Sequence, residues 1–92
     1  MEPKTTTVNP GAQFNGPDDG LTFGEKAVGL TFNPGGDPKV TKIKELYAAI
    51  IDNCNVLRIE AGQGEKARLL SVAITEAQTA QMWAVKGITY KY

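Results

Sequence analysis

Apolar residues recur at helical spacing over two long stretches of this chain. In the first stretch, Asp37 is a favourable N-cap residue and Pro38 suits the first position of a helix. The apolar residues that follow are three or four positions apart, as expected for one buried face. They are Val40, Ile43, Tyr47, Ile50, Cys54 and Leu57. The pattern predicts a helix over about residues 38–57.

The second stretch, residues 65–92, contains no proline, and its only glycine is Gly87. Its apolar residues are too numerous for the single stripe of a surface helix, which indicates burial on more than one side. We predict a helix over about residues 65–88. Because 92 residues offer little else to cover it, part of its surface should contact another copy of the chain. The sequence therefore predicts an oligomer.

The segment between these stretches, residues 58–64, is short and holds two glycines. Short connections between helices produce antiparallel neighbours. The predicted fold is all-α, with residues 37–92 forming an antiparallel two-helix hairpin.

Residues 1–36 form a segment of different composition, with seven of the ten glycines and four of the five prolines. Such a segment cannot be one long helix, so we expect an irregular N-terminal arm that docks on the hairpin, with residues 1–12 mobile. Residues 20–23 (GLTF) are repeated at 29–32. The repeat is either a coincidence of composition or a pair of short extended pieces, each placing Leu and Phe on a neighbour.

Composition excludes several classes of site. There is no histidine and only one cysteine, Cys54, so neither a structural zinc site nor histidine-assisted nucleophilic catalysis is expected. Cys54 should be a buried, reduced thiol that packs in the core. No apolar run approaches the roughly 20 residues that span a bilayer, and no signal-peptide pattern is present. We expect a cytosolic protein without metal, cofactor or membrane partner.

The net charge is zero but unevenly distributed, at −3 for residues 1–38 and +3 for residues 39–92. This is too weak for a protein that binds duplex nucleic acid through its phosphates. It suits a small anionic ligand that is held by a few cations.

Several side chains could contact such a ligand, although each also has an ordinary structural explanation. Lys42, Lys44 and Arg68 are candidate phosphate ligands or simply solvated cations. Trp83 and Tyr90 could stack on nucleobases or pack in an interface. Thr75 belongs to a polar strip on the second helix that could donate hydrogen bonds or face solvent, and Lys86 lies near the end of that helix.

The chain resembles the helical-hairpin domain of bacteriophage anti-CBASS and anti-Thoeris sponge proteins over about residues 29–90. The resemblance rests on the segment 29–37 (GLTFNPGGD), on Lys42-Ile43-Lys44, on Arg68, on residues 73–77 (AITEA) and on residues 82–86 (MWAVK). It implies a non-enzymatic oligomer, commonly a hexamer, that binds cyclic nucleotide signals between protomers and sequesters them without cleavage.

The resemblance also suggests individual residues. Phe32 and Asn33 match an aromatic or polar residue before the first helix, Lys44 or Lys42 matches an early lysine, and Lys86 matches a late basic residue. Relatives often carry histidine or a second aromatic before the first helix, which this chain lacks. The expected ligand-binding residues are Phe32, Asn33, Lys42, Lys44, Arg68, Thr75, Trp83, Lys86 and Tyr90.

The leading hypothesis is a sponge for cyclic di- or trinucleotides that blocks CBASS-type signalling in the host bacterial cytoplasm. One alternative is a sponge for cyclic ADP-ribose isomers. Another is a structural or regulatory phage oligomer that binds no small ligand. An enzyme is the least favoured reading, because no nucleophile–base pair is evident.

Overall fold

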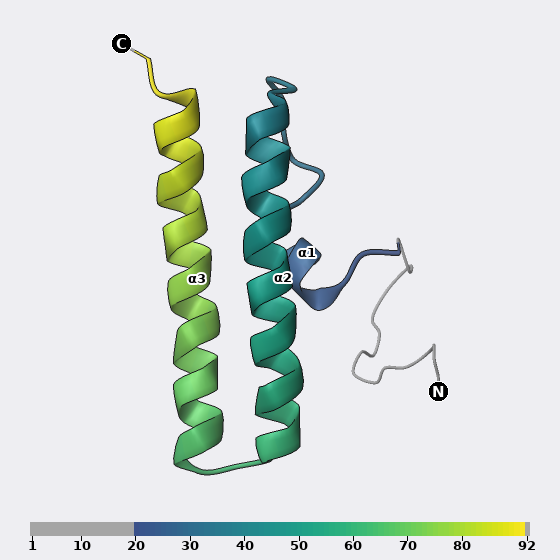
Figure 1. The fold of residues 1–92 in the computed structure, drawn as a ribbon, viewed down its shortest axis with the longest axis vertical. Helices are drawn as coiled ribbons and strands as arrows, with labels where there is room; N and C mark the ends of the chain where they lie inside the picture. The colour runs from purple at the N-terminus through teal and green to yellow at the C-terminus, as the bar shows by residue number, and fades with distance from the viewer. Residues whose placement is uncertain (1–19, 92) are drawn as a thin grey trace.

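Three helices make up the structure, a computed structural model that describes residues 20–91. They are α1 (Phe23–Val28), α2 (Pro38–Ala61) and α3 (Glu65–Thr89). The long helices α2 and α3 run antiparallel side by side, and α1 lies across α2 (Figure 1). No strand occurs in this part of the chain. The predicted all-α hairpin is confirmed.

The boundaries of the hairpin helices follow local signals. The side chain of Asp37 accepts a hydrogen bond from the backbone N–H of Lys39, and Pro38 occupies the first turn. The helix α2 ends only at Gly62, whose φ of +79° disfavours other residues. It therefore extends past the predicted end at Leu57, because nothing between there and Gly62 breaks a helix.

The expectation of an irregular arm is corrected at α1. Thr22 caps this helix, its hydroxyl accepting from the N–H of Glu25 while the Glu25 carboxylate accepts from the N–H of Thr22. This is a capping box, with the T-x-x-E spacing visible in the sequence. The helix ends at Gly29, with φ +63°. The high glycine content of residues 1–36 argued against a helix there, so the sequence analysis did not predict α1.

The repeated GLTF motif does not form two extended pieces, which excludes the second of the two alternatives and leaves a coincidence of composition. Its first copy runs into α1 at Phe23. Its second copy begins at the C-cap Gly29 and turns, with the N–H of Phe32 donating to the Gly29 carbonyl at 2.9 Å. The predicted mobility of residues 1–12 falls outside the described residues.

Close backbone contact fixes α1 on α2. A Cβ added at Gly24 would lie 2.2 Å from the Ala48 carbonyl oxygen, so only glycine allows this approach. The Asp52 carboxylate accepts from the N–H of Gly24 at 2.6 Å and from the Thr22 hydroxyl at 2.7 Å. An acidic group at a helix N-terminus also interacts favourably with the helix dipole. On the α3 side, Gln78 donates to the Ala27 carbonyl.

The buried core is small and lies where the three helices meet. It consists of Val28, Ala48, Ile51 and Ile74, with Cys54 among the partly buried residues packed against it. The Cys54 thiol is free but only partly buried, which corrects the expectation of full burial. Large apolar side chains remain exposed on both hairpin helices: Leu46, Ile50, Val56, Leu57, Ile59, Leu69, Val72, Met82 and Trp83.

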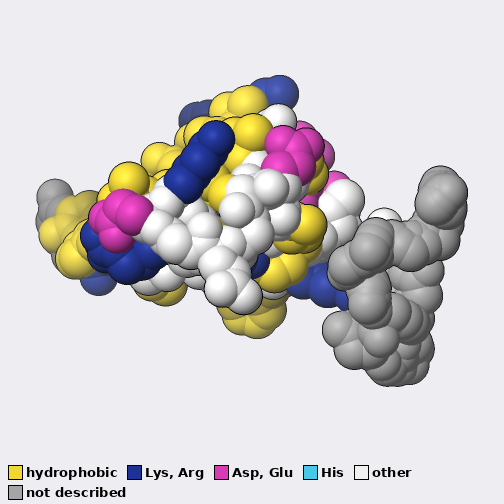
Figure 2. Space-filling model, turned by 90° about the horizontal axis from the view of Figure 1, so that it is seen from below, with side chains coloured by type: hydrophobic (Ala, Val, Ile, Leu, Met, Phe, Trp, Pro, Cys, Tyr) yellow, Lys and Arg dark blue, Asp and Glu magenta, His cyan; other side chains and the backbone are white. Residues whose placement is uncertain are grey.

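None of the helices within residues 20–91 has the length and apolar character to cross a membrane. Seen from the end that carries the α2–α3 connection, hydrophobic, basic and acidic side chains alternate over the surface (Figure 2). This face therefore has no continuous basic area of the kind that binds a phosphate backbone.

Candidate ligand-binding site

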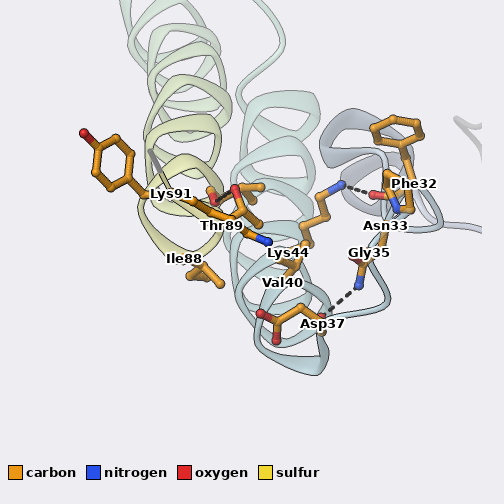
Figure 3. A pocket seen from close by; sticks show the side chains of 12 residues that line it. Phe32, Asn33, Gly35, Asp37, Val40, Lys44, Ile88, Thr89 and Lys91 are labelled. Carbon is orange, nitrogen blue, oxygen red and sulfur yellow. Dashed lines mark hydrogen bonds between the residues drawn. The ribbon is translucent and has the colours of Figure 1, made fainter.

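A cavity of about 540 Å³ opens at the end of the hairpin opposite the α2–α3 connection. Three segments surround it: the α1–α2 loop, the first turns of α2, and the end of α3 (Figure 3). Its lining residues are Phe32, Asn33, Pro34, Gly35, Asp37, Val40, Lys44, Val85, Ile88, Thr89, Tyr90 and Lys91. Its volume falls within the usual range for small-molecule sites.

The α1–α2 loop forms a fixed wall that carries an aromatic ring. The Asn33 amide donates to the Asp37 carbonyl at 2.9 Å and to the Thr41 hydroxyl at 3.0 Å. The Asn33 carbonyl accepts from the N–H of Gly36, whose φ is +69°. Phe32 is 71% exposed although its backbone is held. A ring exposed on an ordered loop is a surface on which a flat base can stack.

Lys44 is buried beneath this loop, with only 4% of its surface exposed. Its ammonium donates to the Gly29 carbonyl at 2.9 Å and to the Phe32 carbonyl at 2.6 Å. It also lies 5.5 Å from the centre of the Phe32 ring. These contacts use two of the three N–H donors of an ammonium group. Lys44 therefore holds the loop in place and has one donor left for a ligand.

The opposite wall comes from α3 and the residues after it. Val85 and Ile88, with Val40 of α2, supply apolar surface. The Thr89 hydroxyl donates to the Val85 carbonyl, which leaves its oxygen as an acceptor toward the cavity. Beyond the helix, Lys91 adds a second cation to the lining. The site combines the face of an aromatic ring, amide and hydroxyl groups, and two cations. These groups can stack on a ligand, hydrogen-bond to it and pair with its negative charge.

The structure brings together four of the nine residues expected from the sequence: Phe32, Asn33, Lys44 and Tyr90 all line the cavity. The other five do not. Lys42, Thr75, Trp83 and Lys86 are exposed on the hairpin helices outside the lining, and the Thr75 hydroxyl donates to the Ser71 carbonyl. Their roles in binding stay predictions, which in an oligomer depend on what a second copy places beside them.

Arg68 lies at the far end of the hairpin, near the start of α3. Its guanidinium makes a two-point ion pair with Glu65, at 2.9 and 2.6 Å. The hydrogen bond from Arg68 lowers the pKa of Glu65, and the same bond raises the pKa of Arg68. Both side chains are exposed, so this pair adds little to stability.

Sequence reasoning did not select Asp37, Val40, Val85, Ile88 or Lys91 for the site. Asp37 was interpreted as a helix cap, and it does cap α2. The other four residues could have been found from their positions in the sequence. The start of α2 and the end of α3 lie at the same end of an antiparallel hairpin, so side chains from both line one cavity.

Arg58 is a further basic residue, and its guanidinium makes its contacts with other residues of the fold. It donates to the Ser71 hydroxyl at 3.2 Å and to the Asn55 side-chain carbonyl at 2.6 Å. It also lies over the Phe23 ring, 5.5 Å from its centre. Arg58 thereby links α1, α2 and α3. Across residues 20–91, no group of acidic or cysteine side chains could hold a metal ion.

Comparison with known proteins gave one result. The family model described as "Acb2/Tad1, hairpin domain" matches residues 25–89. A search of curated proteins and a search of solved structures gave no match. The matched region contains all three helices except the first residues of α1.

Proposed function

This chain belongs to the Acb2/Tad1 hairpin family, and from that premise we propose that it sequesters cyclic oligonucleotide second messengers without cleaving them. Membership implies a phage cyclic-nucleotide sponge. In this proposal the protein acts in the host bacterial cytoplasm and prevents CBASS-type effectors from receiving their signal. Cyclic di- or trinucleotides are the proposed ligands.

The observation that carries the proposal is the cavity at the end of the hairpin. A cyclic dinucleotide presents flat bases, ribose hydroxyls and phosphates. The cavity wall offers the Phe32 ring, the polar groups of Asn33 and Thr89, and the cations Lys44 and Lys91. An arrangement of this kind supports binding of an intact nucleotide, because each part of the ligand has a group of matching chemistry.

We also propose that the protein is a homo-oligomer, with a hexamer as the resemblance to sponge proteins implies. On α2, Leu46, Ile50 and Leu57 are each about half exposed and share one face by their spacing. On α3, Leu69, Val72 and Trp83 are 43–67% exposed. Apolar surface on both long helices supports association of copies on two sides. Trp83 and Lys86 would then lie at or near such contacts.

Native mass spectrometry with a panel of cyclic di- and trinucleotides and cyclic ADP-ribose isomers tests the proposal. The expected result is an oligomer that takes up a cyclic di- or trinucleotide and releases it unchanged on denaturation. A degraded nucleotide would show an enzyme. Uptake of a cyclic ADP-ribose isomer alone would indicate the other ligand class. An oligomer that binds none of them would be a structural protein.

A further inference from the structure

We infer that Lys91 is the phosphate-binding cation of the cavity and that Asp37 directs the phosphate toward it. The inference rests on the proposed function, because it assigns an orientation to a phosphate-bearing ligand in the same site. Lys91 lies just beyond the residues matched by the family model, so the family resemblance does not point to it.

Lys44 is the other cation in the lining, and its ammonium is largely committed. Two of its donors bond to the carbonyls of Gly29 and Phe32, and the group is 4% exposed. A phosphate that drew this ammonium away would leave both carbonyls without their partner. An unpaired buried polar group is costly, so Lys44 can offer at most its remaining donor.

Lys91 has the opposite situation. It is exposed, and it makes no hydrogen bond or ion pair in the described part of the chain. Figure 3 shows it at the end of α3, on the side of the cavity across from Phe32 and Asn33. All three of its donors are available to a phosphate. A base stacked on Phe32 would therefore leave the phosphate facing Lys91.

The remaining candidate for anion binding in the cavity is the N-terminus of α2. The Asp37 side chain caps this terminus, so it is not available to an anion. A helix N-terminus with free N–H groups attracts phosphate. Here the Asp37 carboxylate already accepts from the N–H of Lys39 at 2.9 Å, and its negative charge lies in the cavity wall. Like charges repel, so a phosphate avoids this corner and moves toward Lys91.

The test compares three substitutions in the full-length chain. Lys91→Met removes the proposed cation. Lys66→Met is the matched control, because Lys66 is an exposed lysine on helix α3 but outside the cavity lining and outside the expected ligand-binding residues. Asp37→Asn removes the charge while keeping a good N-cap residue. Each variant is titrated with cyclic dinucleotides by calorimetry at low and high salt. Each is also titrated with pyrophosphate while the lysine side-chain NMR signals are followed.

We expect Lys91→Met to weaken binding about ten-fold and to reduce its salt dependence, in the range of one charged hydrogen bond. Lys66→Met should bind like the parent. Asp37→Asn should bind about three-fold more tightly, a gain that misfolding would not produce. Pyrophosphate should shift the Lys91 signals more than those of Lys44.

The outcomes separate this inference from the proposed function. If the parent binds a cyclic dinucleotide and Lys91→Met binds it equally well, the inference is wrong and the function stands. If no cyclic nucleotide binds but pyrophosphate shifts Lys91 in the parent, the function is wrong and the phosphate site stands. If the parent binds no cyclic nucleotide and pyrophosphate does not shift the Lys91 signals, both are wrong.

Discussion

The two ends of the hairpin each carry a basic residue, and the two residues differ in what their charge can do. At the cavity end, Lys44 is 4% exposed and bonds to two backbone carbonyls. At the connection end, the Arg68 side chain is 62% exposed and pairs with Glu65 on the same helix. The buried ammonium of Lys44 determines the shape of a loop. The exposed guanidinium of Arg68 stays hydrated, so water weakens its ion pair with Glu65. A basic residue in a sequence therefore says little about function until its burial is known.

The largest expected effect concerns the contact that holds α1 against the middle of α2 (Figure 1). Gly24→Ala would place a Cβ 2.2 Å from the Ala48 carbonyl oxygen, so α1 must shift or detach. We expect the free energy of unfolding to fall by about 2–3 kcal/mol, in the range of overpacked contacts. Urea denaturation at one fixed protein concentration measures this.

Gly87→Ala is the matched control, because Gly87 lies within α3 and a Cβ there meets nothing within 4 Å. Alanine is favoured over glycine inside a helix, so this variant should be stabilised by about 0.5–1 kcal/mol. If both glycine variants lose stability equally, close packing of α1 is not the reason that Gly24 is needed.

The comparison of the two basic residues can be tested directly. Lys44→Ala should weaken cyclic dinucleotide binding by about 1–3 kcal/mol, because it removes a charged group and releases the loop that carries Phe32. Arg68→Ala should leave dinucleotide binding unchanged, since Arg68 is at the other end of the hairpin. It should instead weaken any cyclic trinucleotide that binds where several copies meet. Calorimetry with both ligand classes provides the measurement.

Hydrogen exchange of residues 29–36 in the free protein sharpens this test. If Lys44 holds the loop, the amides of this segment should exchange faster in Lys44→Ala and at the parental rate in Arg68→Ala. Equal exchange in the two variants would count against the positioning of the loop by Lys44, whatever happens to ligand affinity.

The exposed apolar surface between the two ends should carry subunit contacts. Trp83 is 67% exposed on α3, so Trp83→Glu should disturb the fold of one chain little while placing a charge in the proposed interface. We expect a lower oligomer mass in light scattering, with unchanged helix content by circular dichroism. Thr75→Glu, another exposed position on α3, shows whether any added charge has this effect. A parental mass for Trp83→Glu would place the interface elsewhere.

The smallest expected effect is the pH dependence of the Glu65–Arg68 pair. Arg68 lowers the pKa of Glu65 below its ordinary value of 4.5. A lowered folded-state pKa contributes stability above the ordinary value, and that contribution is lost as the pH falls through the folded-state value. Glu65→Gln should therefore be slightly less stable than the parent at neutral pH, and the difference should vanish in acid. Thermal melts across this range measure it, and a difference that persists in acid would contradict the assignment.

Local signals in the sequence determined the hairpin. Asp37 and Pro38 started α2 where expected, and the glycines at 62 and 64 produced the reversal into α3. These features depend on neighbouring residues alone: a side chain caps the nearest N–H groups, and glycine permits a positive φ. The capping box at Thr22 also depends only on residues close in the sequence. It was not predicted, because the glycines around it argued against a helix.

Only the tertiary structure decided what the polar residues do. The spacing of residues along a helix gives its faces, but it does not say how far each helix is rotated about its axis against its neighbour. That rotation placed Val85, Ile88 and Thr89 in the cavity wall and left Trp83 and Lys86 outside it. It also buried Lys44 under carbonyls that are 12 and 15 residues away in the chain. Contacts between residues this far apart in the sequence depend on how whole helices and loops pack, which a local sequence pattern does not determine.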